Sequence, residues 1–164
     1  MKLNNNSMKT SLKSVLALTT LLAILVLGTA CQKEEKTHTG VMITDAWVSE
    51  IMPATTVTSG YLTIMNHTDK DDVLLEVKSS ISKYVEMHEM VEIEGAMRMK
   101  RLESIPVAKS GMVTFKTGGK HIMFIETVGK LTVGDKVSVT LVFKNAGDKV
   151  VEMEVKSVKD MHHN

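Results

Sequence analysis

Apolar and polar residues alternate with a period of two along most of this chain. Near its end, Val151, Met153 and Val155 alternate with Glu152 and Glu154, which makes one side of the segment apolar and the other charged. A period of two is that of a β-strand, whose successive side chains point to opposite faces. The pattern predicts nine strands, over residues 41–48, 60–66, 73–77, 84–90, 97–102, 111–116, 121–127, 136–144 and 149–158.

Turn-forming residues separate these segments, and no long segment has a helical period. Glu94-Gly95, Gly118-Gly119 and Asn145-Ala146-Gly147-Asp148 are examples of such turns. Many short strands joined by regular turns favour an all-β fold, and specifically an antiparallel β-sandwich.

Residues 1–30 are typical of an export signal. Lys2, Lys9 and Lys13 precede an apolar segment over residues 14–30, which ends in small residues. We expect this signal peptide to be cleaved. The alternative is an uncleaved anchor, because about seventeen apolar residues nearly span a bilayer.

The only cysteine, Cys31, directly follows Gly28-Thr29-Ala30, which resembles the lipobox of bacterial lipoprotein precursors. Leu27 lies four residues before the cysteine, whereas a lipobox usually has leucine three residues before it. We therefore predict acylation of Cys31, with ordinary cleavage after Ala30 as the alternative. Both place the mature protein outside the cytoplasm, as a periplasmic lipoprotein in the first case. The predicted segments are a flexible tether over 31–40, one domain over 41–158 and a tail over 159–164.

Charge and cysteine content narrow the function. Without the three leader lysines, the 20 basic and 19 acidic residues of the full chain leave a net charge of −2, which does not suggest nucleic-acid binding. A single cysteine in the tether leaves the domain no disulfide and no thiolate ligand, which excludes a blue-copper electron-transfer site. No enzyme is expected, because no nucleophile–histidine or paired-carboxylate arrangement stands out.

Two histidines and two methionines, His88, Met99, His121 and Met123, form the pattern His-x10-Met-x21-His-x-Met. His121 and Met123 are two apart on a predicted strand, so they project to the same side. His88 and Met99 flank the Glu94-Gly95 turn, which places both near one hairpin. Imidazoles and thioethers are soft, uncharged ligands that together favour Cu(I) over Zn(II).

The alternative to a metal site is chance proximity in a methionine-rich chain. The sequence contains 13 methionines, and methionine commonly fills gaps in cores. We interpret Met87, Met90, Met97 and Met112 as core or surface packing in this way.

The four-residue motif resembles, without insertion, that of the periplasmic copper chaperone family called PCuAC. The resemblance extends over residues 41–156 and includes Asp45-Ala46-Trp47, Gly60-Tyr61-Leu62, the segments 85–90, 118–123 and 131–135, and the strand over 137–143. It implies a cupredoxin-like β-sandwich in which His88, Met99, His121 and Met123 bind a single Cu(I) ion. One departure is Glu89, because many members have methionine directly after the first histidine.

The resemblance also implies a role in copper delivery. Its recipient would be the binuclear copper site in subunit II of a haem-copper cytochrome oxidase, with a Sco-type thioredoxin-like protein as reductant or co-chaperone. Two alternatives remain open. The same ligands would serve a periplasmic copper-buffering or resistance protein, and a lipid-anchored β-sandwich could bind another protein without any metal.

The end of the chain carries Met161, His162 and His163. These residues are a candidate secondary ligand set for Cu(II) on a flexible tail, which would pass copper inward. The alternative is a solvated terminus without a metal role.

Overall fold

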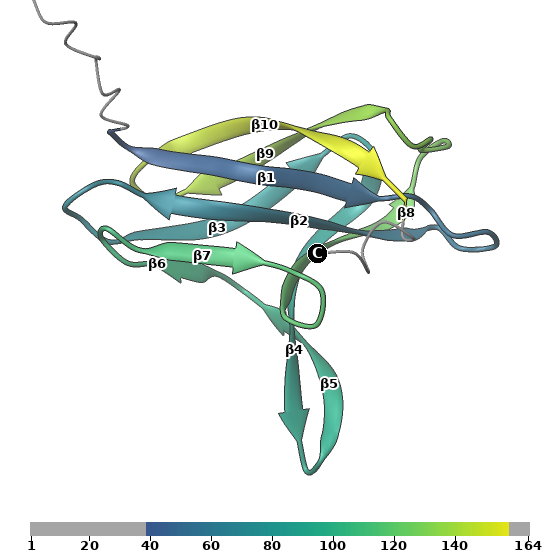
Figure 1. Ribbon diagram of the computed structural model, residues 1–164, viewed down its shortest axis with the longest axis horizontal. Coiled ribbons are helices and arrows are strands. Elements are labelled where there is room, and N and C mark those ends of the chain that lie inside the picture. The colour runs from purple at the N-terminus through teal and green to yellow at the C-terminus, as the bar shows by residue number, and fades with distance from the viewer. Residues whose placement is uncertain (1–38, 158–164) are drawn as a thin grey trace, which may run out of the picture. The chain divides into compact units, whose positions relative to one another are not determined.

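The computed structural model describes residues 39–157, which form β-strands joined by turns and loops (Figure 1). The described residues contain no helix, and so none that could cross a membrane. The all-β prediction is confirmed. The strands are β1 (Val41–Ser49), β2 (Val57–Asn66), β3 (Asp72–Ser79), β4 (Ser82–Ile93), β5 (Ala96–Leu102), β6 (Ile105–Val107), β7 (Met112–Phe115), β8 (Lys120–Thr127), β9 (Lys136–Phe143) and β10 (Gly147–Lys156).

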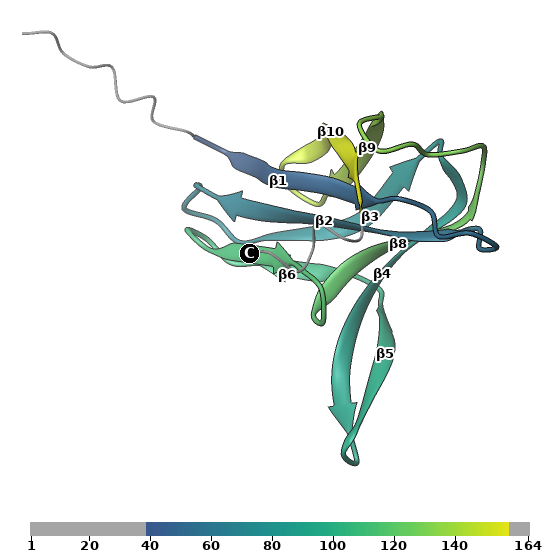
Figure 2. The same cartoon turned by 45° about the vertical axis from the view of Figure 1, so that its right-hand side comes forward.

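All ten strands belong to one hydrogen-bonded sheet, in the order β5-β4-β8-β7-β2-β1-β10-β9-β3-β6. Neighbours run antiparallel, except that β1 with β10 and β7 with β8 are parallel. The sheet curls over, so that β3 lies behind β2 in both views (Figure 1, Figure 2). The Asn66 amide at the end of β2 then reaches the Val107 carbonyl of β6. The predicted sandwich is therefore confirmed as one curled sheet with two layers.

The core lies inside this curl and takes alternate residues from nearly every strand. On β2, Leu62 and Ile64 are buried, whereas Thr63 and Met65 face outward. Burying each such large apolar side chain contributes about 1.5–3 kcal/mol to stability. The other fully buried side chains include Val48, Leu74, Ile105, Val107, Ile122, Phe124, Val139, Leu141, Met153 and Val155.

The nine predicted strands are all present, with ends that shift by up to three residues. The structure adds β6, which the sequence pattern did not reveal. β6 has only three residues and contains Pro106, which is tolerated because β6 is the edge strand. The predictions about the leader, Cys31 and the tail with Met161, His162 and His163 concern residues outside the described range.

The β4–β5 hairpin projects away from the rest of the sheet (Figure 2). Ile93 pairs with Ala96, which leaves Glu94 and Gly95 as a two-residue loop. Both loop residues have positive φ, 51° and 77°, as a type I′ turn requires. The turn therefore matches the twist of the two strands, and it fixes which residues of β4 and β5 face each other.

Gly60 on β2 offers a test of how tightly the core is packed. A Cβ atom at this position would lie 2.8 Å from the Phe124 ring and 3.2 Å from the Met153 methyl group. Both neighbours are fully buried, so neither can move aside without disturbing the core. We expect Gly60→Ala to lower the free energy of unfolding by about 1–3 kcal/mol, measured by chemical denaturation.

Gly119→Ala is the matched control, because the added methyl group would lie 3.4 Å from the flexible Lys116 side chain and 3.6 Å from the Lys116 carbonyl oxygen, both ordinary van der Waals distances. Its φ is also outside the left-handed region. Equal stability losses in the two variants would contradict this account of Gly60.

Candidate metal centre

The two histidines of the motif are direct cross-strand neighbours. His88 on β4 pairs with His121 on β8. Their ring centroids are 5.9 Å apart and the rings are inclined by 31°. Because a metal–imidazole bond is about 2.0 Å long, one ion can lie within reach of both rings.

His121 is held in one orientation by the turn that precedes β8. Gly118 adopts a left-handed conformation, with φ of 75°, and the turn directs the Gly119 carbonyl toward the imidazole. Since a carbonyl only accepts, the His121 Nδ1–H group donates to it, over 3.0 Å. This tautomer leaves the lone pair on Nε2. The side chain itself is 6% exposed.

His88 is oriented by a carboxylate. Its Nε2 lies 2.8 Å from Glu86 Oε2, and Glu86 Oε1 in turn accepts from Arg101 Nη1 over 2.9 Å. Nε2 therefore carries the proton, and the lone pair is on Nδ1. Within residues 39–157, this Nδ1 is the only buried side-chain nitrogen or oxygen atom without a hydrogen-bond partner. A carboxylate that fixes the far nitrogen of a histidine is the usual second layer around a metal ligand.

The register places both methionines on the same face as the histidines. Met123 is two residues from His121, pairs with Glu86 on one side and Ser59 on the other, and is half-buried. Met99 is 51% exposed. It lies one row farther along the hairpin than His88, because Arg101 is the residue directly opposite His88 on β5. The structure thus brings all four residues of the motif to the outer face of β5-β4-β8.

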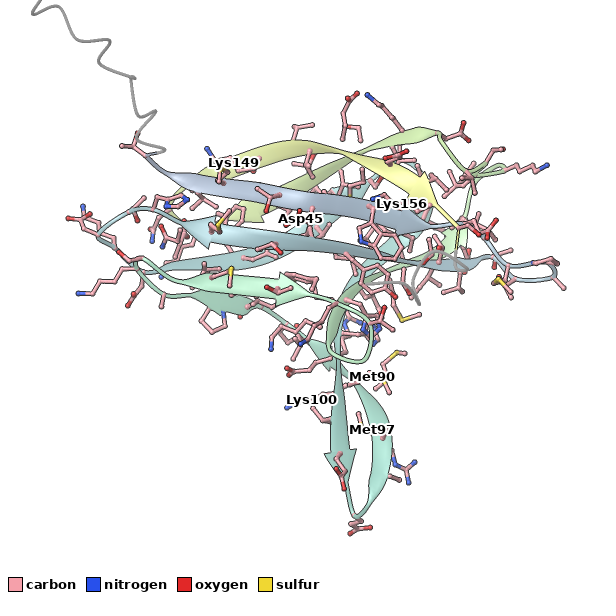
Figure 3. All side chains as sticks on the ribbon, in the orientation of Figure 1. Asp45, Met90, Met97, Lys100, Lys149 and Lys156 are labelled. Atoms are coloured by element: carbon pink, nitrogen blue, oxygen red, sulfur yellow. The ribbon has the colours of Figure 1, made fainter. Side chains whose placement is uncertain are left out.

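Met90 shares this face, although the sequence analysis assigned it to packing. It is two residues from His88 on β4 and directly opposite Met99 on β5. Once β4 is recognised as a strand, the spacing of two residues from His88 indicates that Met90 lies on the same face. The same spacing, in the opposite direction along β4, applies to Glu86. Met87, by contrast, is 5% exposed in the core, as its packing interpretation predicts. Figure 3 labels Met90 and Met97 on the projecting hairpin.

The donor atoms gathered here are soft and uncharged. The described part of the chain contains no group of three or more His, Cys, Asp or Glu side chains that could hold a metal ion. Thioethers together with imidazoles suit a soft monovalent cation. Neutral ligands also leave the charge of the ion uncompensated.

Solved structures with the same fold define the class of this domain. The copper-bound PCuAC domain from PmoF2 matches with a TM-score of 0.61 and 25% identity, covering 71% of this chain and 92% of that one. Apo-DR1885 from Deinococcus radiodurans matches with a TM-score of 0.57 and 23% identity, covering 78% and 86%. The resemblance to the PCuAC family is confirmed.

A family model places the chain more narrowly. The model described as "Putative lipoprotein LpqE-like" matches residues 41–155, so this chain belongs to the LpqE-like family. It is also similar to "Putative lipoprotein Lxx21020" from Leifsonia xyli, with 27% identity over 92% of this chain and 95% of the relative. "Uncharacterized protein RP573" from Rickettsia prowazekii is 28% identical over 58% of this chain and 53% of its own length.

The hydrogen bonds of the two rings predict opposite tautomers in the metal-free protein at pH 8. His121 should carry its proton on Nδ1, because Gly119 accepts it, and His88 on Nε2, because Glu86 accepts it. Long-range 1H–15N correlation spectra of the imidazoles distinguish the two forms. A His88 ring protonated on Nδ1 would contradict the proposed orientation.

Proposed function

We propose that this protein is an extracytoplasmic metallochaperone that binds one Cu(I) ion through His88, Met99, His121 and Met123. The observation that carries the proposal is the buried, unpartnered Nδ1 of His88, on a ring that faces His121. A buried nitrogen without a partner costs about 1–3 kcal/mol, and a bound ion would supply the missing partner. Homology to PCuAC domains, one of them copper-bound, supports the choice of metal.

The arrangement suits a site that must also release its ion. The imidazoles are fixed by Gly119 and Glu86, whereas Met99 is half exposed on the projecting hairpin. An incoming ligand can therefore displace the outer thioether first, while the histidines still hold the ion. Met90 is placed to take over from Met99, because the two face each other across the hairpin.

We propose subunit II of a cytochrome oxidase as the recipient of the copper, with a Sco-type thioredoxin-like protein as reductant or co-chaperone. The protein would act as an exported, periplasmic lipoprotein attached through Cys31, and the lipoprotein descriptions of its family and of the Leifsonia relative support this location. Met161, His162 and His163 would add a weaker Cu(II) site.

Anaerobic titration of the purified protein with Cu(I), in competition with a chromogenic chelator, tests the site. We expect one tight equivalent in the wild-type protein and its loss in His121→Ala. Met123→Leu should weaken binding at least tenfold while the domain stays folded, because leucine is nearly isosteric with methionine but lacks the sulfur atom.

Met52→Leu is the control for the loss of a thioether, because Met52 is exposed and lies in the loop between β1 and β2, outside the motif. No tight equivalent in the wild-type protein would refute the proposal and favour a metal-free interaction domain. If the tight equivalent is found, an assay for transfer of the bound copper to an oxidase subunit II domain would distinguish copper delivery from copper buffering.

Glu86 should tune the affinity without touching the ion. Glu86→Gln removes the carboxylate that holds His88 and that Arg101 neutralises, so we expect Cu(I) affinity to fall about 10–100-fold in the same titration. Glu89→Gln is the control, because Glu89 bonds Lys120 instead of a histidine. Equal losses in the two variants would indicate a general charge effect and contradict the role of Glu86.

A further inference from the structure

Three other methionines form a single row across the outer face of the sheet. Met42 on β1 pairs with Met65 on β2, and Met65 pairs on its other side with Met112 on β7. The three strands are adjacent in the sheet (Figure 1). No residue of this row belongs to the His88–His121 site.

The burial pattern shows that the row faces away from the core. Ile64, next to Met65, is fully buried and pairs with Ile43 and Val113. Because successive residues point to opposite faces, Met65 and its two partners point outward. Met112 is 66% exposed, and the other two methionines are half-buried.

The next outward row on the same three strands contains only threonine. Thr63 pairs with Thr44 on one side and with Thr114 on the other. Threonine is typical of an exposed sheet surface, whereas methionine is not among the residues enriched in strands. Three methionines in register therefore need a reason beyond strand propensity.

The spacing of the row allows the three sulfur atoms to converge. Side chains directly opposite each other on paired strands have Cβ atoms about 4.5–5.5 Å apart. Met65 is central, so both outer methionines lie one strand away from it. Methionine has three rotatable bonds beyond its backbone, which lets the outer thioethers lean toward the central one without any backbone change.

We propose that Met42, Met65 and Met112 form a second Cu(I) site, made of thioethers alone and weaker than the His88–His121 site. Thioethers select Cu(I) among the common metal ions, and they bind no protons that would compete with it. The row contains no imidazole, thiolate or carboxylate, which the harder divalent ions prefer. The site would hold Cu(I) at the surface of the domain.

The two sites are separate in the fold. Gly60 on β2 pairs with Ile122, which lies between His121 and Met123, whereas Met65 is five residues farther along the same strand. At about 3.3 Å per residue, the row lies about 17 Å away along β2. A loss of one site should therefore leave the other intact.

Stoichiometry tests the proposal on the full protein under anaerobic conditions, with a weak and a strong Cu(I) chelator as competitors. We expect a second equivalent of Cu(I) that the protein binds in the presence of the weak chelator and loses to the strong one. Met65→Leu should weaken it at least tenfold and leave the tight equivalent unchanged, whereas His121→Ala should do the reverse. Met52→Leu should change neither.

The NMR signals of the methionine methyl groups provide a second measurement, which reports binding at each methionine directly and does not depend on the stability of the folded protein. With 13C-labelled methionine methyl groups, Ag(I) added as a redox-inert analogue of Cu(I) to the His121→Ala protein should shift the Met42, Met65 and Met112 signals together. Unshifted signals, or a weak equivalent that survives Met65→Leu, would overturn the second site. A tight equivalent that survives His121→Ala would instead refute the proposed function and leave the second site standing.

Discussion

His88 and His121 face each other because the residues next to them on β4 and β8 are buried in the hydrophobic core. Met87, Ile122 and Phe124 pack on the inner face of the same two strands, so β4 and β8 have little freedom to slide. A shift of one residue would turn each buried side chain outward and each histidine inward. At about 1.5–3 kcal/mol for each large apolar side chain, that exchange is unfavourable. The hydrophobic core thus sets the geometry of a site that lies outside it.

The same register produces the support around the site. Glu86 is two residues from His88 and directly opposite Met123, and Arg101 faces His88 from the other neighbouring strand. The carboxylate therefore meets both the imidazole and the guanidinium group on one face. This arrangement leaves the Nδ1 of His88 buried without a partner, which costs stability in the metal-free protein. Such a cost is typical of a binding site whose ligands are oriented before the ligand arrives.

The methionines lie at three kinds of position: on the projecting hairpin, on the outer face of the sheet and in the core. Met99 lies exposed on the projecting hairpin, whereas Met42, Met65 and Met112 lie across the body of the sheet. Met87 and Met153 fill the core. One residue type thus serves packing and candidate ligation, and only the face of the strand separates the two uses.

By itself, the sequence determined nine of the ten strands in the described residues and the shared face of His121 and Met123, because both follow from a period of two within one segment. It also placed His88 and Met99 on one hairpin through the Glu94-Gly95 turn. Only the tertiary structure decided which strands became neighbours. The pairing of His88 with His121 and the Met42–Met65–Met112 row both depend on contacts between segments that are distant in the sequence. The local period of two does not predict those contacts, because they form only when the whole sheet curls to bury one core.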